Sequence, residues 1–148
     1  MCLICDRIKM INEGENPYFV CELETGFVVL GDYQRFKGYT LFLCKKHVAE
    51  LHDFPYDFKM KYLEEMSLVA EAVYNVYKPE KMNYELLGNG DTHVHWHLFP
   101  RVEGDTPIRG PVWLLPREEM CSDQFKPSVV ELEEKTRELK KEIERILK

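Results

Sequence analysis

Three of the five histidines in this chain lie in one short run, His93-Val94-His95-Trp96-His97. On a β-strand successive side chains point to opposite faces, so the three imidazoles would share one face, about 6.6–6.8 Å apart. The intervening Val94 and Trp96 would face the core. Imidazoles are poor core residues because both ring nitrogens need partners when they are buried. The run therefore predicts a strand with an apolar back and an imidazole front.

Three interpretations of this imidazole face follow from the residues alone. The face is simply polar and exposed, or the three rings bind one metal ion, as strand spacing permits. In the third interpretation the rings divide nucleophilic and acid–base work between them. A neutral imidazole is a competent nucleophile near pH 7, because its ordinary pKa is about 6.5.

The cysteines offer a second group of reactive side chains. The chain contains five of them, an odd number, and a disulfide framework is not expected. Cys2 and Cys5 form a C-x-x-C pair, which in a protein expected to be intracellular indicates metal or redox chemistry. Cys21 and Cys44 lie in apolar, strand-like runs and are expected to be small core residues.

The elements that must position these groups are predicted from periodicity and turn residues. Alternating or β-rich runs predict five strands, at residues 18–23, 26–30, 39–44, 83–88 and 93–99. An apolar stripe at steps of three and four predicts a helix over 55–78. A second helix is predicted over 128–148, where Ser128 and Glu131 form a capping box. This order lacks regular βαβ alternation, so we expect an α+β fold with a mainly antiparallel five-stranded sheet, a packed helix and a C-terminal helix.

Length and charge limit the possible classes of protein. A chain of 148 residues fits one domain, and the net charge of -6 argues against a protein whose main partner is a nucleic-acid backbone. No apolar run approaches the ~18 residues of a membrane span, and no membrane partner is expected. The first residues lack a basic region followed by an apolar stretch, so they do not form a secretory signal, and a cytoplasmic location is expected.

The sequence also resembles a known family. The run from His93 to Arg101, HVHWHLFPR, is similar to the histidine triad (HIT) motif, in which histidines alternate with apolar residues before Pro-Arg. Residues 38–47, GYTLFLCKKH, resemble the family's second landmark, a glycine and a strand followed by a basic segment ending in histidine. The C-x-x-C start and the LLGN approach at 86–89 also resemble bacterial zinc-containing members of the diadenosine polyphosphate hydrolase kind. The resemblance covers residues 2–117 as a triad core, followed by the helix at 128–148.

The resemblance implies a fold, an activity and a set of catalytic residues. HIT proteins have a mainly antiparallel sheet and usually form homodimers by joining two sheets. They act on small nucleotides at an α-phosphate joined to a leaving group. By motif position His95 would be the nucleophile, with its other ring nitrogen held by the backbone carbonyl of His93. His97 would contact the phosphate or the leaving-group oxygen.

The resemblance also implies binding residues and a metal site. Asn89 would donate its amide to phosphate oxygens, and Asp32 would accept hydrogen bonds from a sugar diol; both also fit as plain turn residues. Cys2, Cys5, His47 and His93 resemble the zinc ligands of zinc-bearing members. Two cysteines and two histidines suit a tetrahedral structural zinc. The alternative is that both cysteines are free thiols on a frayed terminus.

The chain departs from the family pattern in two places. Many relatives have a histidine after the glycine of the strand landmark, where this chain has Tyr39, so a proton relay through that position is in doubt. Many relatives also have a Gly-Gln or similar pair before the triad, where this chain has Asp91-Thr92. Thr92 would supply a hydroxyl to the phosphate in its place. Trp113 is expected to pack on a partner subunit or to line the pocket.

Three function classes remain open from the sequence. The first, which we favour, is a hydrolase that cleaves dinucleoside polyphosphates or nucleoside phosphoramidates, with water completing the reaction. The second is a nucleotidyltransferase or phosphorylase with phosphate or a sugar phosphate as acceptor. The third is a non-catalytic, zinc-stabilised nucleotide-binding protein.

Overall fold

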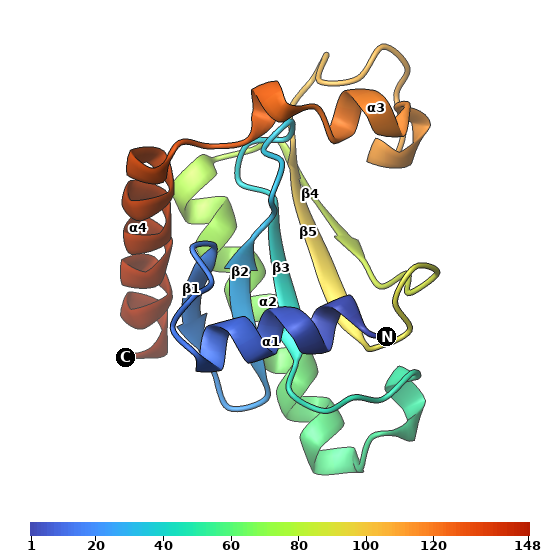
Figure 1. Cartoon of the computed structure of the whole chain (residues 1–148), viewed down its shortest axis with the longest axis vertical. Helices are drawn as coiled ribbons and strands as arrows, with labels where there is room; N and C mark the ends of the chain where they lie inside the picture. The colour runs from blue at the N-terminus through green and yellow to red at the C-terminus, as the bar shows by residue number, and fades with distance from the viewer.

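A five-stranded antiparallel sheet forms the centre of the protein, which is described here as a computed structural model covering residues 1–148. The strands lie in the order β1-β2-β3-β5-β4, and every neighbouring pair is antiparallel. The strand bounds are β1 Phe19–Glu22, β2 Gly26–Leu30, β3 Thr40–Cys44, β4 Lys81–Glu85 and β5 His95–Arg101. The predicted α+β fold is therefore confirmed, and β5 lies inside the sheet between β3 and β4 (Figure 1).

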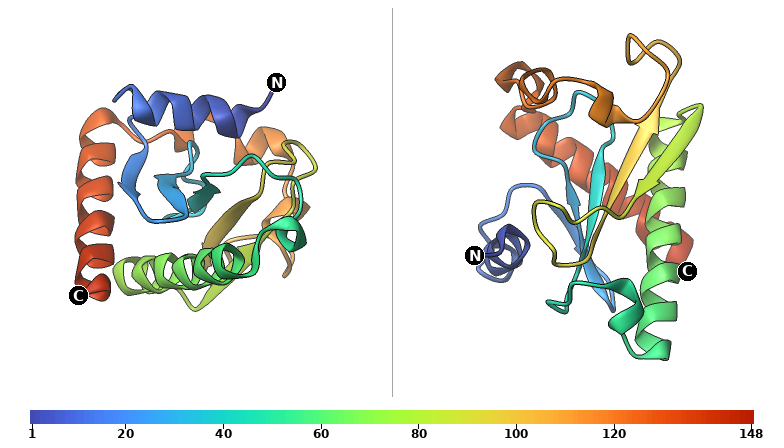
Figure 2. Two further views of the ribbon diagram at one scale, coloured as in Figure 1. Left: turned by 90° about the horizontal axis from the view of Figure 1, so that it is seen from below. Right: turned by 90° about the vertical axis from the view of Figure 1, so that its right-hand side faces the viewer.

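Helices cover both faces of this sheet. The helix α2 (Tyr56–Tyr77) packs on one face, and α4 (Val129–Leu147) lies beside α2 and the edge strand β1. The helix α1 (Leu3–Asn12) crosses the opposite face, so the sheet lies between α1 and α2 in the left view of Figure 2. Each face therefore has its own apolar cluster, and β2 is buried along its whole length. None of the helices combines the length and the apolar character that crossing a membrane requires.

The two predicted helices agree with the structure, which also contains helical segments that the sequence does not predict. The helix expected over 55–78 is α2, and the one expected over 128–148 is α4, where the Ser128 hydroxyl accepts a hydrogen bond from the Glu131 N–H. The first residues were not assigned to any element, yet they form α1. Three short helical segments, η2 (Val112–Leu114), α3 (Arg117–Met120) and η3 (Asp123–Phe125), also form between β5 and α4.

Two strand positions need correction. The strand expected over 83–88 lies at 81–85, and the strand expected over 93–99 begins only at His95 and continues to Arg101. His93 thus lies before the strand rather than on it. Its neighbour Val94 exchanges backbone hydrogen bonds with Val48 and Cys44, which holds this segment against the loop after β3. Val94 and Trp96 pack in the cluster on the α2 face, as predicted from their alternation with the histidines, and Leu98 packs there with them.

Candidate functional site

His95, the central histidine of the run, is the first residue of β5 and points to the face covered by α1. Its side chain is buried, and its Nδ1 lies 2.7 Å from the backbone carbonyl oxygen of His93. A carbonyl only accepts hydrogen bonds, so Nδ1 must hold the ring proton and donate it. The Nε2 lone pair is then free, which is the protonation pattern that a nucleophilic imidazole needs.

His97 lies one step along the same face, at a ring-centroid distance of 4.8 Å from His95. Its Nδ1 lies 2.6 Å from the hydroxyl oxygen of Tyr39, the residue directly before β3. Burial, with a smaller contribution from His95, lowers the pKa of His97 to about 4. The His97 ring is therefore neutral at pH 7.

A pocket of about 250 Å³ opens in front of these two histidines. One wall comes from α1, another from the segment before β3, and a third from β5 and the residues after it. The apolar and aromatic lining residues are Leu3, Ile4, Tyr33, Phe36, Tyr39, Leu41, Phe99, Trp113, Met120 and Cys121. An apolar cavity with a few converging polar groups is the usual form of a small-molecule site.

Asp32 lies on the wall of this pocket, but its carboxylate is already paired. Arg7 of α1 donates two hydrogen bonds to the two carboxylate oxygens, at 2.8 and 2.7 Å. Both side chains are about one third exposed. Asp32 is therefore in the pocket that contains His95, and a sugar hydroxyl would share the carboxylate with Arg7.

The loop between β4 and β5 holds the two other predicted binding residues in different hollows. Asn89 lines a hollow of about 450 Å³ together with His95, His97 and Trp113. Thr92 lines a separate hollow of about 300 Å³, which it shares with His95 and with residues before and at the start of α2. The structure thus brings Asn89 near both histidines, whereas Thr92 adjoins His95 only.

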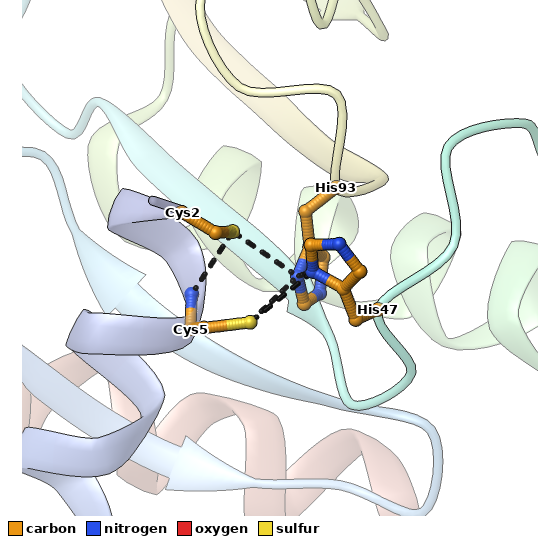
Figure 3. Close-up of side chains that lie close together, drawn as sticks. All are labelled: Cys2, Cys5, His47 and His93. Atoms are coloured by element: carbon orange, nitrogen blue, oxygen red, sulfur yellow. Dashed lines mark hydrogen bonds between the residues drawn. The ribbon is translucent and has the colours of Figure 1, made fainter.

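The remaining predicted residues form a compact cluster at the N-terminal end of α1 (Figure 3). Cys2 and Cys5 come from α1 and its cap, His47 from the loop after β3, and His93 from the segment before β5. The Nδ1 atoms of His47 and His93 are 3.2 Å apart, and the Cys5 Sγ lies 3.2 and 3.5 Å from them. The Cys2 Sγ lies 3.6 Å from the Nδ1 of His93.

The four distances above are close to those in a tetrahedral zinc site, and all four donor atoms lie within 4.8 Å of one another. With Zn–N near 2.0–2.1 Å and Zn–S near 2.3 Å, tetrahedral angles place nitrogens about 3.3 Å apart and nitrogen and sulfur about 3.6 Å apart. The other ring nitrogen of His93, Nε2, donates to the carbonyl oxygen of Cys44 at 2.6 Å. That bond leaves the Nδ1 lone pair pointing toward the cysteines, as a metal-ligating histidine requires.

The contacts that join α1 to the pocket are not predictable from the sequence. Arg7 pairs with Asp32, and the Leu3 N–H donates to an Asp91 carboxylate oxygen at 3.0 Å. Trp113, which was expected to line the pocket or to meet a partner, does line it, and its indole N–H donates to Glu85. A wider hollow of about 750 Å³ lies along β4 and residues 101–111, but it contains none of the predicted site residues.

Comparison with known proteins identifies the class to which this fold and site belong. The profile of the HIT domain matches residues 14–104. A HIT-like protein of Methanocaldococcus jannaschii with no characterised function is 33% identical over 113 residues, which cover 73% of this chain and 84% of the relative. The chain therefore belongs to the HIT family, which confirms the resemblance found in its sequence.

Other similar proteins extend the comparison. The adenosine 5'-monophosphoramidase of Saccharomyces cerevisiae is 28% identical over 102 residues, which cover 68% of this chain and 62% of the yeast enzyme. A histidine triad protein from Bradyrhizobium japonicum has the same fold, with a TM-score of 0.73 at 21% identity, over 84% of this chain and 89% of that one. A zinc-bound family member from Mycobacterium smegmatis superposes with a TM-score of 0.64 at 21% identity, over 98% and 94% of the two chains.

Proposed function

We propose that this protein hydrolyses small nucleotides at the α-phosphate, through a nucleotidyl intermediate on His95. The substrates would be dinucleoside polyphosphates or nucleoside phosphoramidates. The observation that supports this most strongly is the 2.7 Å contact between His95 Nδ1 and the His93 carbonyl oxygen, which leaves Nε2 as a free nucleophile beside the pocket. The monophosphoramidase activity of the yeast relative is chemistry of the same kind.

The reaction would proceed in two displacements. In the first, His95 Nε2 forms a bond to the α-phosphorus while the bond from phosphorus to the leaving group breaks. In the second, a water oxygen attacks the same phosphorus, the N–P bond breaks, and a nucleoside monophosphate leaves with the imidazole restored. Dividing the displacement in this way replaces one difficult step by two easier ones.

The neighbouring polar groups would bind the phosphate and the sugar. His97 and Asn89 share one hollow with His95, so both are in a position to donate hydrogen bonds to phosphate oxygens as charge develops there. Asp32 would accept hydrogen bonds from the sugar diol beside Arg7. Thr92, in the adjoining hollow, would contact the phosphate group only from the other side of His95.

We also propose that Cys2, Cys5, His47 and His93 bind one structural zinc ion. The four side chains form a complete donor set, which leaves no open position of the kind that a catalytic zinc needs. When bound, the ion would fix the start of α1 against the segment that precedes His95. The zinc-bound histidine triad protein from Mycobacterium smegmatis, which has a similar fold, supports this proposal.

We also propose that two copies of the chain form a homodimer through their β4 strands. The edge strand β1 lies against α4, whereas β4 is the other edge of the sheet and has β5 as its only neighbouring strand. An open edge of this kind presents unpaired N–H and C=O groups to a second chain. Sedimentation velocity would detect two associated chains, and a species of one chain at all concentrations would contradict this part of the proposal.

Hydrolysis and transfer differ in the molecule that accepts the nucleotidyl group from His95, which is water in the first and phosphate or a sugar phosphate in the second. With a dinucleoside polyphosphate in water enriched in heavy oxygen, we expect one heavy oxygen atom in the released nucleoside monophosphate. Added inorganic phosphate should leave both the rate and the products unchanged. Formation of a nucleoside diphosphate from added phosphate, with no heavy oxygen in the monophosphate, would instead identify a phosphorylase. Mass spectrometry of the products makes both measurements.

A further inference from the structure

Tyr39 lies in the site, but neither the family match nor the proposed reaction assigns it a role. Its hydroxyl oxygen lies 2.6 Å from Nδ1 of His97, and this is its only hydrogen-bond partner in the structure. The proposed reaction needs His97 as a donor at its other nitrogen, Nε2. The direction of the hydrogen bond between Tyr39 and His97 therefore decides whether that donor exists.

Contacts restrain both the ring and the backbone of Tyr39. The ring stacks on Phe99 with a centroid distance of 4.0 Å and an interplanar angle of 12°. The backbone of Gly31 also approaches the ring so closely that a Cβ there would lie 2.1 Å from it. The carbonyl oxygen of Tyr39 accepts hydrogen bonds from the Gly31 N–H and the Gln34 side-chain amide. The hydroxyl is thus presented to His97 from a nearly fixed ring.

The chemistry of the two groups fixes the direction of the bond. Burial raises the pKa of the Tyr39 hydroxyl well above its ordinary value, so the oxygen keeps its hydrogen. Because that hydrogen has no other acceptor, it is satisfied only if the hydroxyl donates to Nδ1. A neutral imidazole has one N–H, and a ring that accepts at Nδ1 must hold its hydrogen at Nε2.

We infer that Tyr39 is a positioning residue that fixes His97 in the tautomer with hydrogen on Nε2. His97 then presents a permanent hydrogen-bond donor beside His95, toward the place where phosphate oxygens would lie. The two histidines consequently have opposite tautomers: His95 holds its hydrogen on Nδ1 and attacks with Nε2, whereas His97 accepts at Nδ1 and donates with Nε2. The kinetic consequence of this inference rests on the proposed function, but the tautomer itself does not.

The test is nitrogen NMR of the imidazole rings combined with the Tyr39→Phe variant. In the native protein we expect His97 to show a protonated Nε2 and an unprotonated Nδ1. Phenylalanine keeps the stack on Phe99 and removes only the hydroxyl, so in Tyr39→Phe the His97 resonances should shift toward a mixture of tautomers. We expect kcat to fall about tenfold, with KM within about twofold, because the lost donor acts on the transition state.

Tyr62→Phe provides the matched control. Tyr62 is a fully buried tyrosine that donates to the carbonyl oxygen of Phe42, so its loss tests a missing core hydroxyl away from the pocket. It should leave the His97 resonances unchanged. A native His97 with hydrogen on Nδ1, or a Tyr39→Phe protein with unchanged resonances, would overturn the inference. The His97 resonances test the tautomer even if the protein has no hydrolase activity. Failure of the proposed function would be recognised separately, because no turnover would be observed.

Discussion

The His95→Ala variant should lose at least about 10⁴-fold in kcat while it still binds nucleotide. The expected loss is this large because no other group near the pocket has a free imidazole lone pair to form the covalent bond to phosphorus. Binding should weaken by no more than about fivefold, since only one contact with the ligand is removed. Steady-state kinetics with a dinucleoside polyphosphate and calorimetric titration with a nucleoside monophosphate measure the two effects.

His52→Ala is the matched histidine control for this experiment. The side chain of His52 is 78% exposed and lies outside the triad, so its removal should leave kcat within about twofold. Turnover by His95→Ala at a rate near that of the native protein would contradict a covalent role for His95. Native protein that binds nucleotide without any turnover would instead support the non-catalytic, zinc-stabilised alternative.

The Cys5→Ser variant should lose its zinc and much of its stability. Metal analysis of the native protein should give about one zinc ion per chain, and the variant should contain almost none. A ligand that binds only the folded state at a thousand times its Kd contributes about 4 kcal/mol to the free energy of unfolding. For a chain of this size that corresponds to a fall in Tm on the order of 10 °C, measured by circular dichroism.

The same variant should also bind nucleotide more weakly. The helix α1 and its N-cap Cys2 supply two of the four cluster residues, and α1 also supplies three residues of the pocket wall, Leu3, Ile4 and Arg7. Loosening its first turn would therefore disturb the pocket as well as the metal site. Cys21→Ala is the control, because Cys21 packs in the apolar cluster on the α2 face and belongs neither to the metal cluster nor to the pocket lining. The zinc proposal would be contradicted if the native protein contained no metal, or if a chelator removed the metal without lowering the stability of the protein.

Part of the fold could be predicted because the local pattern and the tertiary structure agree. The stripe of α2 and the cap of α4 at Ser128 are both local signals, and both helices form where those signals indicate. The helix α1 contains a weaker signal. Ile4, Ile8 and Ile11 have helical spacing and pack on the sheet, but the N-cap is Cys2, whose sulfur accepts from the Cys5 N–H. Cysteine is not a usual capping residue, so the start of the helix was not recognised.

The shifted strands have a tertiary cause. The alternating run predicts a strand that ends at Phe99, directly before Pro100, which has no N–H to donate to a neighbouring strand. In the structure β3 pairs with β5 only as far as Leu98, whereas β4 continues opposite Pro100 and Arg101. The missing N–H of Pro100 therefore breaks no bond to β3. The sequence of β5 alone does not show that β3 ends before β4 does.

The candidate site was predictable in its residue types but not in its connections. The resemblance to the family predicts a zinc site at Cys2, Cys5, His47 and His93, and these four residues do lie together in the structure. The pairing of Arg7 with Asp32 and of Tyr39 with His97 was not foreseen. Those partners are 25 and 58 residues apart in the chain, so only the folded sheet and α1 bring them into contact.

Covalent labelling tests the central claim most directly. The native protein is mixed with a dinucleoside polyphosphate radiolabelled at the α-phosphate and quenched with alkali after milliseconds, since N-linked phosphoryl groups survive base better than acid. Our account predicts label attached to the protein in less than one equivalent, recovered after proteolysis on the peptide that contains His95. Rapid turnover with no labelled protein at any time, or label on a different residue, would contradict it.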